Sequence, residues 1–265
     1  MGVASSGGVR ISYEVRGQGE AVLLVHGLGY ERRGWGPLPG LLADEFRVIL
    51  MDNRGVGESE APQGPYTVRQ LASDAAAVLV HAGVPRAHVL GVSLGGFVAQ
   101  ELALSFPERV NKLVLVSTSP GGPNQYPMPA EGLDAFSRYP AMSREGGLRL
   151  MVENSLGRRA VRERPELVEE VYAYRLERAP SVEAWQAQFA AARAFDVFER
   201  LPEIAAPTLV LHGSADTVID VRNGELLANR IPDSRLHVVP ERGHLLVWEE
   251  ADLLAPIVVS FLRGD

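Results

Sequence analysis

The chain has 265 residues, of which 46% are hydrophobic and 22% are charged, and its formal net charge is −7 at pH 7. This composition is typical of a globular protein and excludes the disordered class, which combines low hydrophobicity with high charge. The acidic balance argues against a nucleic-acid partner, which requires a basic surface. The sequence contains no cysteine, which excludes disulfides, thiolate metal sites and a cysteine nucleophile.

The sequence has neither the pattern of a secretory leader nor that of a membrane span. No basic N-terminal stretch precedes an apolar segment, and the longest apolar runs have the length of strands. We therefore expect a soluble, cytoplasmic protein without membrane insertion. The length fits one α/β domain that carries an insertion.

Buried strands alternate with helices in residues 1–119. A loosely alternating antiparallel edge strand is expected at the start, and the later strands are continuous apolar runs, as in a parallel sheet covered on both faces. The expected strands are residues 9–15, 21–25, 47–51, 88–92 and 113–116. The expected helices are residues 37–43, a segment that starts at the Thr67–Gln70 capping box, and a segment that ends near Pro107.

The pattern changes in residues 120–195, where helix signals occur without a convincing buried strand. Ser143, Pro165 and Ser181 each stand where a helix is expected to begin, so we predict a helical cap, or lid. The α/β alternation resumes in residues 196–265. Strands are expected at 208–211 and 236–239, and helices at 221–230 and 251–262. Residues 1–119 and 196–265 are thus the two parts of the predicted core domain.

The strongest motif is G-x-S-x-G, formed by Gly91, Ser93 and Gly95 between an apolar run and a helical pattern. A serine on so sharp a strand-to-helix turn has a strained backbone, and the neighbouring elements leave no room for side chains two positions away. The motif therefore predicts that Ser93 stands exposed at the tip of the sheet as a nucleophile.

A serine nucleophile needs a base to remove its proton and a carboxylate to orient that base. Asp216 follows the strand 208–211 and His244 follows the strand 236–239, so both are expected at the sheet edge where Ser93 lies. Other histidines and aspartates fit regular elements, a helix start or a connection better: His81, His88, His212, His237, Asp196 and Asp220. We predict Asp216 as the orienting acid and His244 as the base.

Two backbone N–H groups are needed for the negatively charged oxygen of the intermediate. We expect one from Leu94, which follows the nucleophile at a helix start, and one from Leu28 in His26-Gly27-Leu28-Gly29. No metal-spaced or phosphate-binding motif occurs, so neither a metal nor an organic cofactor is expected.

These motifs together resemble the α/β-hydrolase superfamily. They are His26-Gly27-Leu28-Gly29, the D-x-R-G-x-G-x-S loop from Asp52 to Ser59, Gly91-Val92-Ser93-Leu94-Gly95, Gly213-x-x-Asp216 and Gly243-His244. The resemblance covers practically the whole chain. It implies a doubly wound, mostly parallel eight-stranded sheet with a helical cap after the sixth strand, a Ser–Asp–His triad in that order, and a structural role for the D-x-R-G loop. Asp220 departs from the family, where many members carry proline.

Within the family the sequence is most similar to 3-oxoadipate enol-lactonases, anthracycline methylesterases, C–C bond hydrolases and cofactor-free haloperoxidase relatives. Ser93 argues against the dehalogenases and epoxide hydrolases, which use aspartate at this position. We predict a serine hydrolase that cleaves a carboxylic ester or lactone of small to medium size. The small-molecule substrate is its expected partner, and the protein is expected to be a monomer or homodimer.

Two rival hypotheses use the same fold. A C–C bond hydrolase needs polar groups to stabilise an enolate, for which Arg193, Asn154 and Asn53 are candidates. The second rival hypothesis is a ligand receptor with little or no turnover. The expected pocket is mainly apolar. Its candidate walls are Tyr30, Trp35, Phe136, Met151, Tyr174, Trp185, Phe189, Val218 and Leu245.

Overall fold

The computed structural model describes residues 1–265, apart from the side chain of Pro140. This described chain forms an eight-stranded sheet in the order β1-β2-β4-β3-β5-β6-β7-β8. The strands are β1 (Gly2–Ser6), β2 (Val9–Arg16), β3 (Ala21–Val25), β4 (Arg47–Met51), β5 (Ala87–Val92), β6 (Val110–Val116), β7 (Thr208–Gly213) and β8 (Ser234–Val239). The β1–β2 and β2–β4 pairs are antiparallel and the remaining pairs are parallel.

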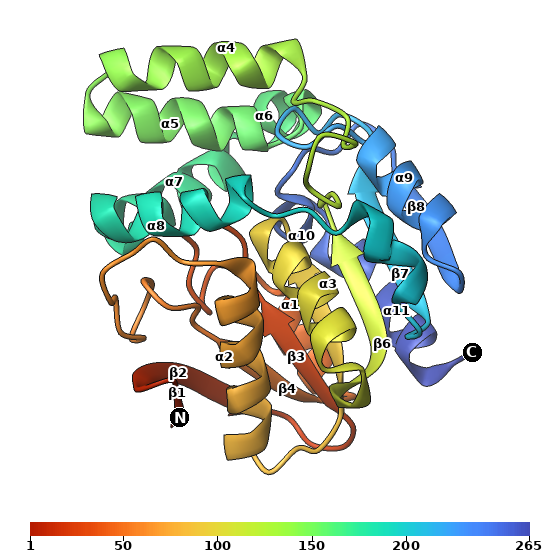
Figure 1. Cartoon of the computed structure of the whole chain (residues 1–265). Helices are drawn as coiled ribbons and strands as arrows, with labels where there is room; N and C mark the ends of the chain where they lie inside the picture. Colours follow the sequence, from red (N-terminus) through yellow and green to blue (C-terminus); the bar gives the residue numbers. More distant parts are fainter.

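Helices cover both faces of this sheet. Figure 1 shows α2 and α3 in front of it and α1 and α11 behind it. The helices of the core are α1 (Leu38–Ala43), α2 (Val68–His81), α3 (Leu94–Ser105), α9 (Arg222–Arg230), α10 (Leu246–Glu249) and α11 (Ala251–Arg263), with short 3-10 helices η1 (Pro107–Arg109) and η3 (Phe198–Glu203). The predicted capping box at the start of α2 is confirmed, because Thr67 and Gln70 bond each other's backbone N–H.

The continuous apolar runs of the strands supply two separate cores. In β3, Val22 and Leu24 pack with α1 and α11, whereas Leu23 and Val25 pack with α2 and α3. This division follows from the two-residue period of a strand, which sends successive side chains to opposite faces. The inner parallel strands β3, β5 and β7 are therefore buried on both sides, as the sequence predicts, whereas the edge strand β8 is only partly buried.

Between β6 and β7 the chain forms a group of helices that we call the cap. It consists of α4 (Ala130–Arg138), η2 (Tyr139–Ala141), α5 (Arg144–Ser155), α6 (Arg158–Glu163), α7 (Pro165–Arg178) and α8 (Val182–Arg193). In Figure 1 the cap lies over the end of the sheet to which the parallel strands point. Ser143 and Ser181 accept N-terminal N–H bonds of α5 and α8, and Pro165 opens α7, as predicted.

One expectation about the elements was wrong, and two helices of the cap were not predicted. The edge strand is β1, and β2 lies inside it, paired with both β1 and β4. The turn between β1 and β2 is made by Gly7 and Gly8, both with positive φ, and the small residues of β1 gave no strand pattern. The cap also contains α4 and α6. Neither helix has a side-chain N-cap that would indicate its start in the sequence.

Candidate active site

Ser93 occupies a strained turn between β5 and α3. Its backbone has φ 54° and ψ −120°, a conformation that non-glycine residues rarely adopt and that costs of order 1–3 kcal/mol. A Cβ on Gly91 would lie 2.2 Å from the Gly95 carbonyl oxygen, and one on Gly95 would lie 1.9 Å from the Val25 carbonyl oxygen. Both glycines of the motif are therefore required by close backbone approach.

Asp216 and His244 lie beyond the ends of β7 and β8 and form a hydrogen bond. His244 Nδ1 is 2.8 Å from Asp216 Oδ2, and both side chains are buried. The other carboxylate oxygen, Oδ1, accepts the backbone N–H groups of Val218 (2.8 Å) and Ile219 (2.9 Å). The structure thus brings the predicted acid and base together, with the carboxylate fixed by the backbone that follows it.

A second histidine contacts the same carboxylate. His212 Nε2 lies 3.3 Å from Asp216 Oδ2 and 2.9 Å from the Ile219 carbonyl oxygen. Burial opposes ionisation of Asp216, but the charges and hydrogen bonds of His244 and His212 hold its pKa below the usual value. Asp216 is therefore an anion at neutral pH, able to hold His244 in one tautomer. His212, predicted as a core or exposed residue, is buried and has this additional contact.

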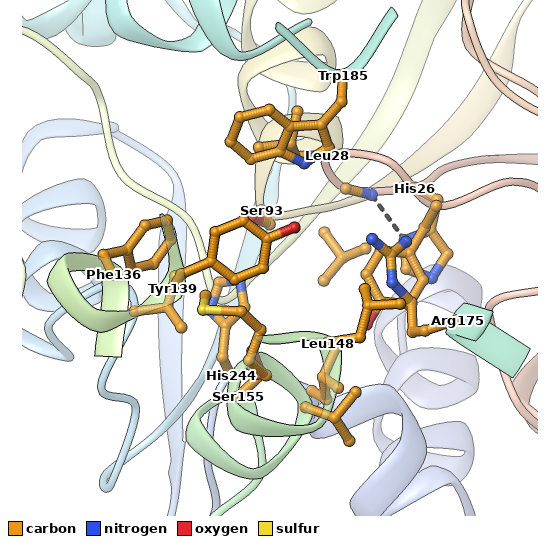
Figure 2. A pocket seen from close by; sticks show the side chains of 17 residues that line it. His26, Leu28, Ser93, Phe136, Tyr139, Leu148, Ser155, Arg175, Trp185 and His244 are labelled. Atoms are coloured by element: carbon orange, nitrogen blue, oxygen red, sulfur yellow. Dashed lines mark hydrogen bonds between the residues drawn. The ribbon is translucent and has the colours of Figure 1, made fainter. Parts of the chain in front are cut away.

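Ser93 and His244 face one cavity of about 180 Å³ between the core and the cap (Figure 2). They form no hydrogen bond with each other in the described structure. Of the predicted walls, six line this cavity: Tyr30, Phe136, Met151, Trp185, Val218 and Leu245. Further lining comes from His26, Gly27, Leu28, Val92, Tyr139, Leu148, Val152, Ser155 and Arg175. The helical spacing of residues 148, 151, 152 and 155 on α5 was a signal for part of this second group.

Three of the predicted walls lie outside the cavity. Trp35 is fully buried in the core, and its ring centroid is 4.6 Å from that of His26. Tyr174 packs between Tyr30 and Trp248. Phe189 stacks on Trp185, at 4.9 Å between ring centroids. Each of the three supports a residue near the site rather than the site itself.

The loop from His26 to Gly29 brings backbone close to Ser93. A Cβ on Gly27 would lie only 3.1 Å from Ser93 Cβ. In the described structure neither Leu28 nor Leu94 uses its N–H to bond another residue. Leu28 lines the cavity, and Leu94 is the first residue of α3. Both N–H groups expected to bind the oxyanion are thus free to bond a ligand. Their role as oxyanion donors stays a prediction.

His26 has a structural role beside this loop. Its Nδ1 accepts the Gly27 N–H (2.7 Å) and its Nε2 lies 2.6 Å from the Gly34 carbonyl oxygen. Burial lowers the pKa of His26 to about 3, so the ring is neutral and donates from Nε2. The D-x-R-G loop lies behind it, where Asn53 donates to the His26 carbonyl oxygen at 3.0 Å.

The polar groups suggested for enolate stabilisation do not meet in the cavity. Asn53 is engaged with His26, and neither Asn154 nor Arg193 is among the lining residues. The cavity contains a different cation, Arg175 of α7, whose guanidinium lies 4.2 Å from the centroid of the Tyr30 ring. Nothing in its local sequence distinguished Arg175 from the other arginines of the cap.

Comparison with known proteins identifies the family. A family model described as alpha/beta hydrolase fold matches residues 20–251. The chain belongs to the α/β-hydrolase family. The 2-hydroxy-6-oxononadienedioate/2-hydroxy-6-oxononatrienedioate hydrolase of Burkholderia vietnamiensis is 35% identical, over 96% of this chain and 91% of the relative. The 3-oxoadipate enol-lactonase 2 of Acinetobacter baylyi is 31% identical, over 96% and 94%.

Solved structures agree with this assignment. The malate-bound structure of a thermophilic esterase from Thermogutta terrifontis has a TM-score of 0.84 at 30% identity, covering 99% of this chain and 96% of that one. The predicted fold class and the resemblance to enol-lactonases and C–C bond hydrolases are confirmed. This α/β hydrolase is therefore a hydrolytic enzyme. No helix in the described chain is long and apolar enough to cross a membrane.

Proposed function

We propose that this α/β hydrolase cleaves a carboxylic ester or lactone through a covalent acyl-enzyme on Ser93. The observation that carries the proposal is the 2.8 Å hydrogen bond from His244 to the buried Asp216, at the cavity into which the strained Ser93 turn opens. A buried carboxylate that orients a histidine beside a serine is the arrangement that acyl transfer requires. The reaction itself needs neither a metal nor an organic cofactor.

The roles follow from the chemistry of acyl transfer. His244 Nε2 takes the proton of the Ser93 hydroxyl as Oγ bonds to the carbonyl carbon, and the electron pair of the C=O bond moves to its oxygen. The N–H groups of Leu28 and Leu94 hold this oxyanion; one such donor contributes about 3 kcal/mol to lowering the barrier. Collapse of the intermediate expels the alcohol with the proton from His244. Water then attacks the acyl-enzyme with His244 again as base, releasing the acid and free Ser93.

The cavity favours a hydrophobic substrate of small to medium size. Aromatic and aliphatic side chains from the cap line the cavity, among them Phe136, Leu148, Met151 and Trp185. Such walls bind apolar acyl or alcohol groups and exclude water from the acyl-enzyme. Because the cap supplies about half of the residues that line the cavity, we expect the cap to take part in determining the substrate.

A second candidate is hydrolytic C–C cleavage of a ring-fission product by the same residues. Arg175 favours it, because this cavity cation has no carboxylate partner within the described chain. A guanidinium in an apolar cavity is suited to a carboxylate-bearing substrate, and the printed name of the Burkholderia relative is that of a dioate hydrolase. The change Arg175→Met should then lower kcat/KM for a carboxylate-bearing substrate relative to its neutral methyl ester by about tenfold or more.

A substrate panel tests the proposal and separates the candidates. The panel contains 4-nitrophenyl acetate and butyrate, an enol-lactone and a ring-fission dienoate, with product formation measured under multiple turnover. We expect turnover of the esters or the lactone, and stoichiometric labelling of Ser93 by an organophosphonate that abolishes it. Turnover of the dienoate alone would favour the second candidate. Labelling of Ser93 without turnover of any substrate would favour the receptor hypothesis and contradict both.

A further inference from the structure

The cap holds the loop that carries the expected oxyanion donor Leu28. Gln188 of α8 is fully buried, and its side-chain oxygen accepts the Gly29 N–H at 2.9 Å. Its side-chain nitrogen donates to the Arg54 carbonyl oxygen at 2.8 Å. One amide thus satisfies a buried donor and a buried acceptor from two loops of the core.

Other cap side chains bond the same short segment. Arg175 donates to the Gly29 carbonyl oxygen, so cap residues bond both polar backbone groups of Gly29. Tyr174 accepts the Glu31 N–H at 3.2 Å. Gly29 has φ +70°, and a Cβ there would lie 3.0 Å from Trp185. The side chains of Trp185 and Arg175 in the cap therefore pack directly against the backbone of this loop.

Arg54 is held rigidly in the core, so its hydrogen bond fixes the position of the Gln188 side chain relative to the core. Its guanidinium forms two 2.7 Å hydrogen bonds to Asp74 of α2, and both side chains are buried. Through Gln188 the position of Gly29 is tied to this ion pair. The Leu28 N–H lies one peptide before Gly29, and a shift of about 1 Å in a catalytic group can cost about a hundredfold in rate.

We propose that Gln188 is a positioning residue that makes the Leu28 half of the oxyanion hole depend on the seated cap. When the cap is seated, the amide fixes the Gly29 peptide and so aims the Leu28 N–H at the developing oxyanion. When the cap moves away from the core, both hydrogen bonds of Gln188 break together. The Leu28 N–H is then no longer held in the direction of the oxyanion. This inference rests on the proposed acyl-transfer function, and it makes the cap part of the catalytic geometry as well as the wall of the pocket.

The test compares Gln188→Leu with Gln186→Leu, the same substitution at an exposed position of the same helix. With 4-nitrophenyl butyrate, Gln188→Leu should lower kcat by about tenfold or more while KM changes by less than about threefold, since the lost interaction belongs to the transition state. A trifluoromethyl ketone forms a tetrahedral adduct on serine, and its inhibition constant should rise by a similar factor. Gln186→Leu should match the wild type in all three quantities.

A Gln188→Leu protein that melts cooperatively and keeps the wild-type kcat and inhibition constant would overturn the inference. If that variant does not fold, Tyr174→Phe removes one cap hydroxyl from the same loop and should lower kcat with KM unchanged; wild-type kcat would then overturn it. The proposed function is tested independently of Gln188: turnover by Ser93→Ala would contradict the proposed function. Ser93-dependent turnover that is insensitive to Gln188 contradicts this inference alone.

Discussion

Asp216 and His244 are joined by a 2.8 Å hydrogen bond between Oδ2 and Nδ1. The carboxylate keeps this geometry because its other oxygen accepts two backbone N–H groups of its own loop. The bond fixes which ring nitrogen of His244 carries a proton in the resting state, and so leaves Nε2 free to act as a base towards Ser93.

We predict that Asp216→Asn lowers kcat by about 10⁴-fold while the protein stays folded. The amide fits the same space but can donate to Nδ1, which favours the wrong tautomer of His244. The control is Asp220→Asn, which alters a carboxylate that pairs with Arg222 outside the cavity. Ester hydrolysis by both variants measures the effect, and an Asp216→Asn enzyme within tenfold of the control would contradict the assigned role.

A second prediction concerns stability and His26. Burial lowers the pKa of His26 to about 3, whereas an unfolded histidine has a pKa of about 6.5. Below about pH 6.5 only the unfolded chain takes up this proton, so the folded state loses stability as the pH falls towards 3, by about 1.4 kcal/mol per pH unit. Above pH 6.5 the ring is neutral in both states and contributes no pH dependence.

Urea unfolding of the wild type and of His26→Asn at pH 7.0, 5.5 and 4.5 measures this effect. The difference in unfolding free energy between the two proteins should change between pH 5.5 and 4.5 by about 1.4 kcal/mol, with the wild type losing more. His237→Asn, which alters an exposed ring, should leave the slope of the wild type unchanged. A constant difference between wild type and His26→Asn over this range would contradict the buried neutral ring.

Glu249 gives a third prediction, about the loop of the base. One carboxylate oxygen of Glu249 accepts the N–H of Gly243, next to His244, at 2.9 Å and the N–H of Gly157 in the cap at 3.0 Å. Glu249→Leu leaves both backbone N–H groups without an acceptor, which should cost roughly 1–3 kcal/mol of stability for each and lower kcat. Glu249→Gln keeps an acceptor oxygen, so we expect it to restore most of both quantities. Equal losses in the two variants would contradict this role.

The parts of the site that rest on local backbone constraints could be predicted from the sequence. The Ser93 turn needs Gly91 and Gly95 within two residues, so the whole constraint lies in one pentapeptide. Asp216 and His244 follow recognisable parallel strands, whose ends meet at one edge of the sheet. The capping box of α2 and the serine caps of α5 and α8 are equally local.

What the sequence did not predict depends on contacts between distant segments. Gln188 bonds Gly29 and Arg54, which lie 159 and 134 residues away, so no local pattern marks it. Helical spacing indicates an apolar face but not what the face packs against, which is why Tyr174 and Phe189 were expected in the pocket. Helix α4 lacks a side-chain N-cap and contains Gly132, where a Cβ would lie 1.9 Å from the Thr217 carbonyl oxygen.

The most direct measurement of the central claim is the steady-state hydrolysis of 4-nitrophenyl butyrate by Ser93→Ala beside the wild type. Removing the nucleophile of a triad costs about 10⁶-fold in kcat in a serine hydrolase. We predict turnover by the wild type and none above the uncatalysed background, within the assay's reach, by a Ser93→Ala protein with a wild-type melting transition. Retention of more than about one-tenth of the wild-type kcat would contradict an acyl-enzyme on Ser93.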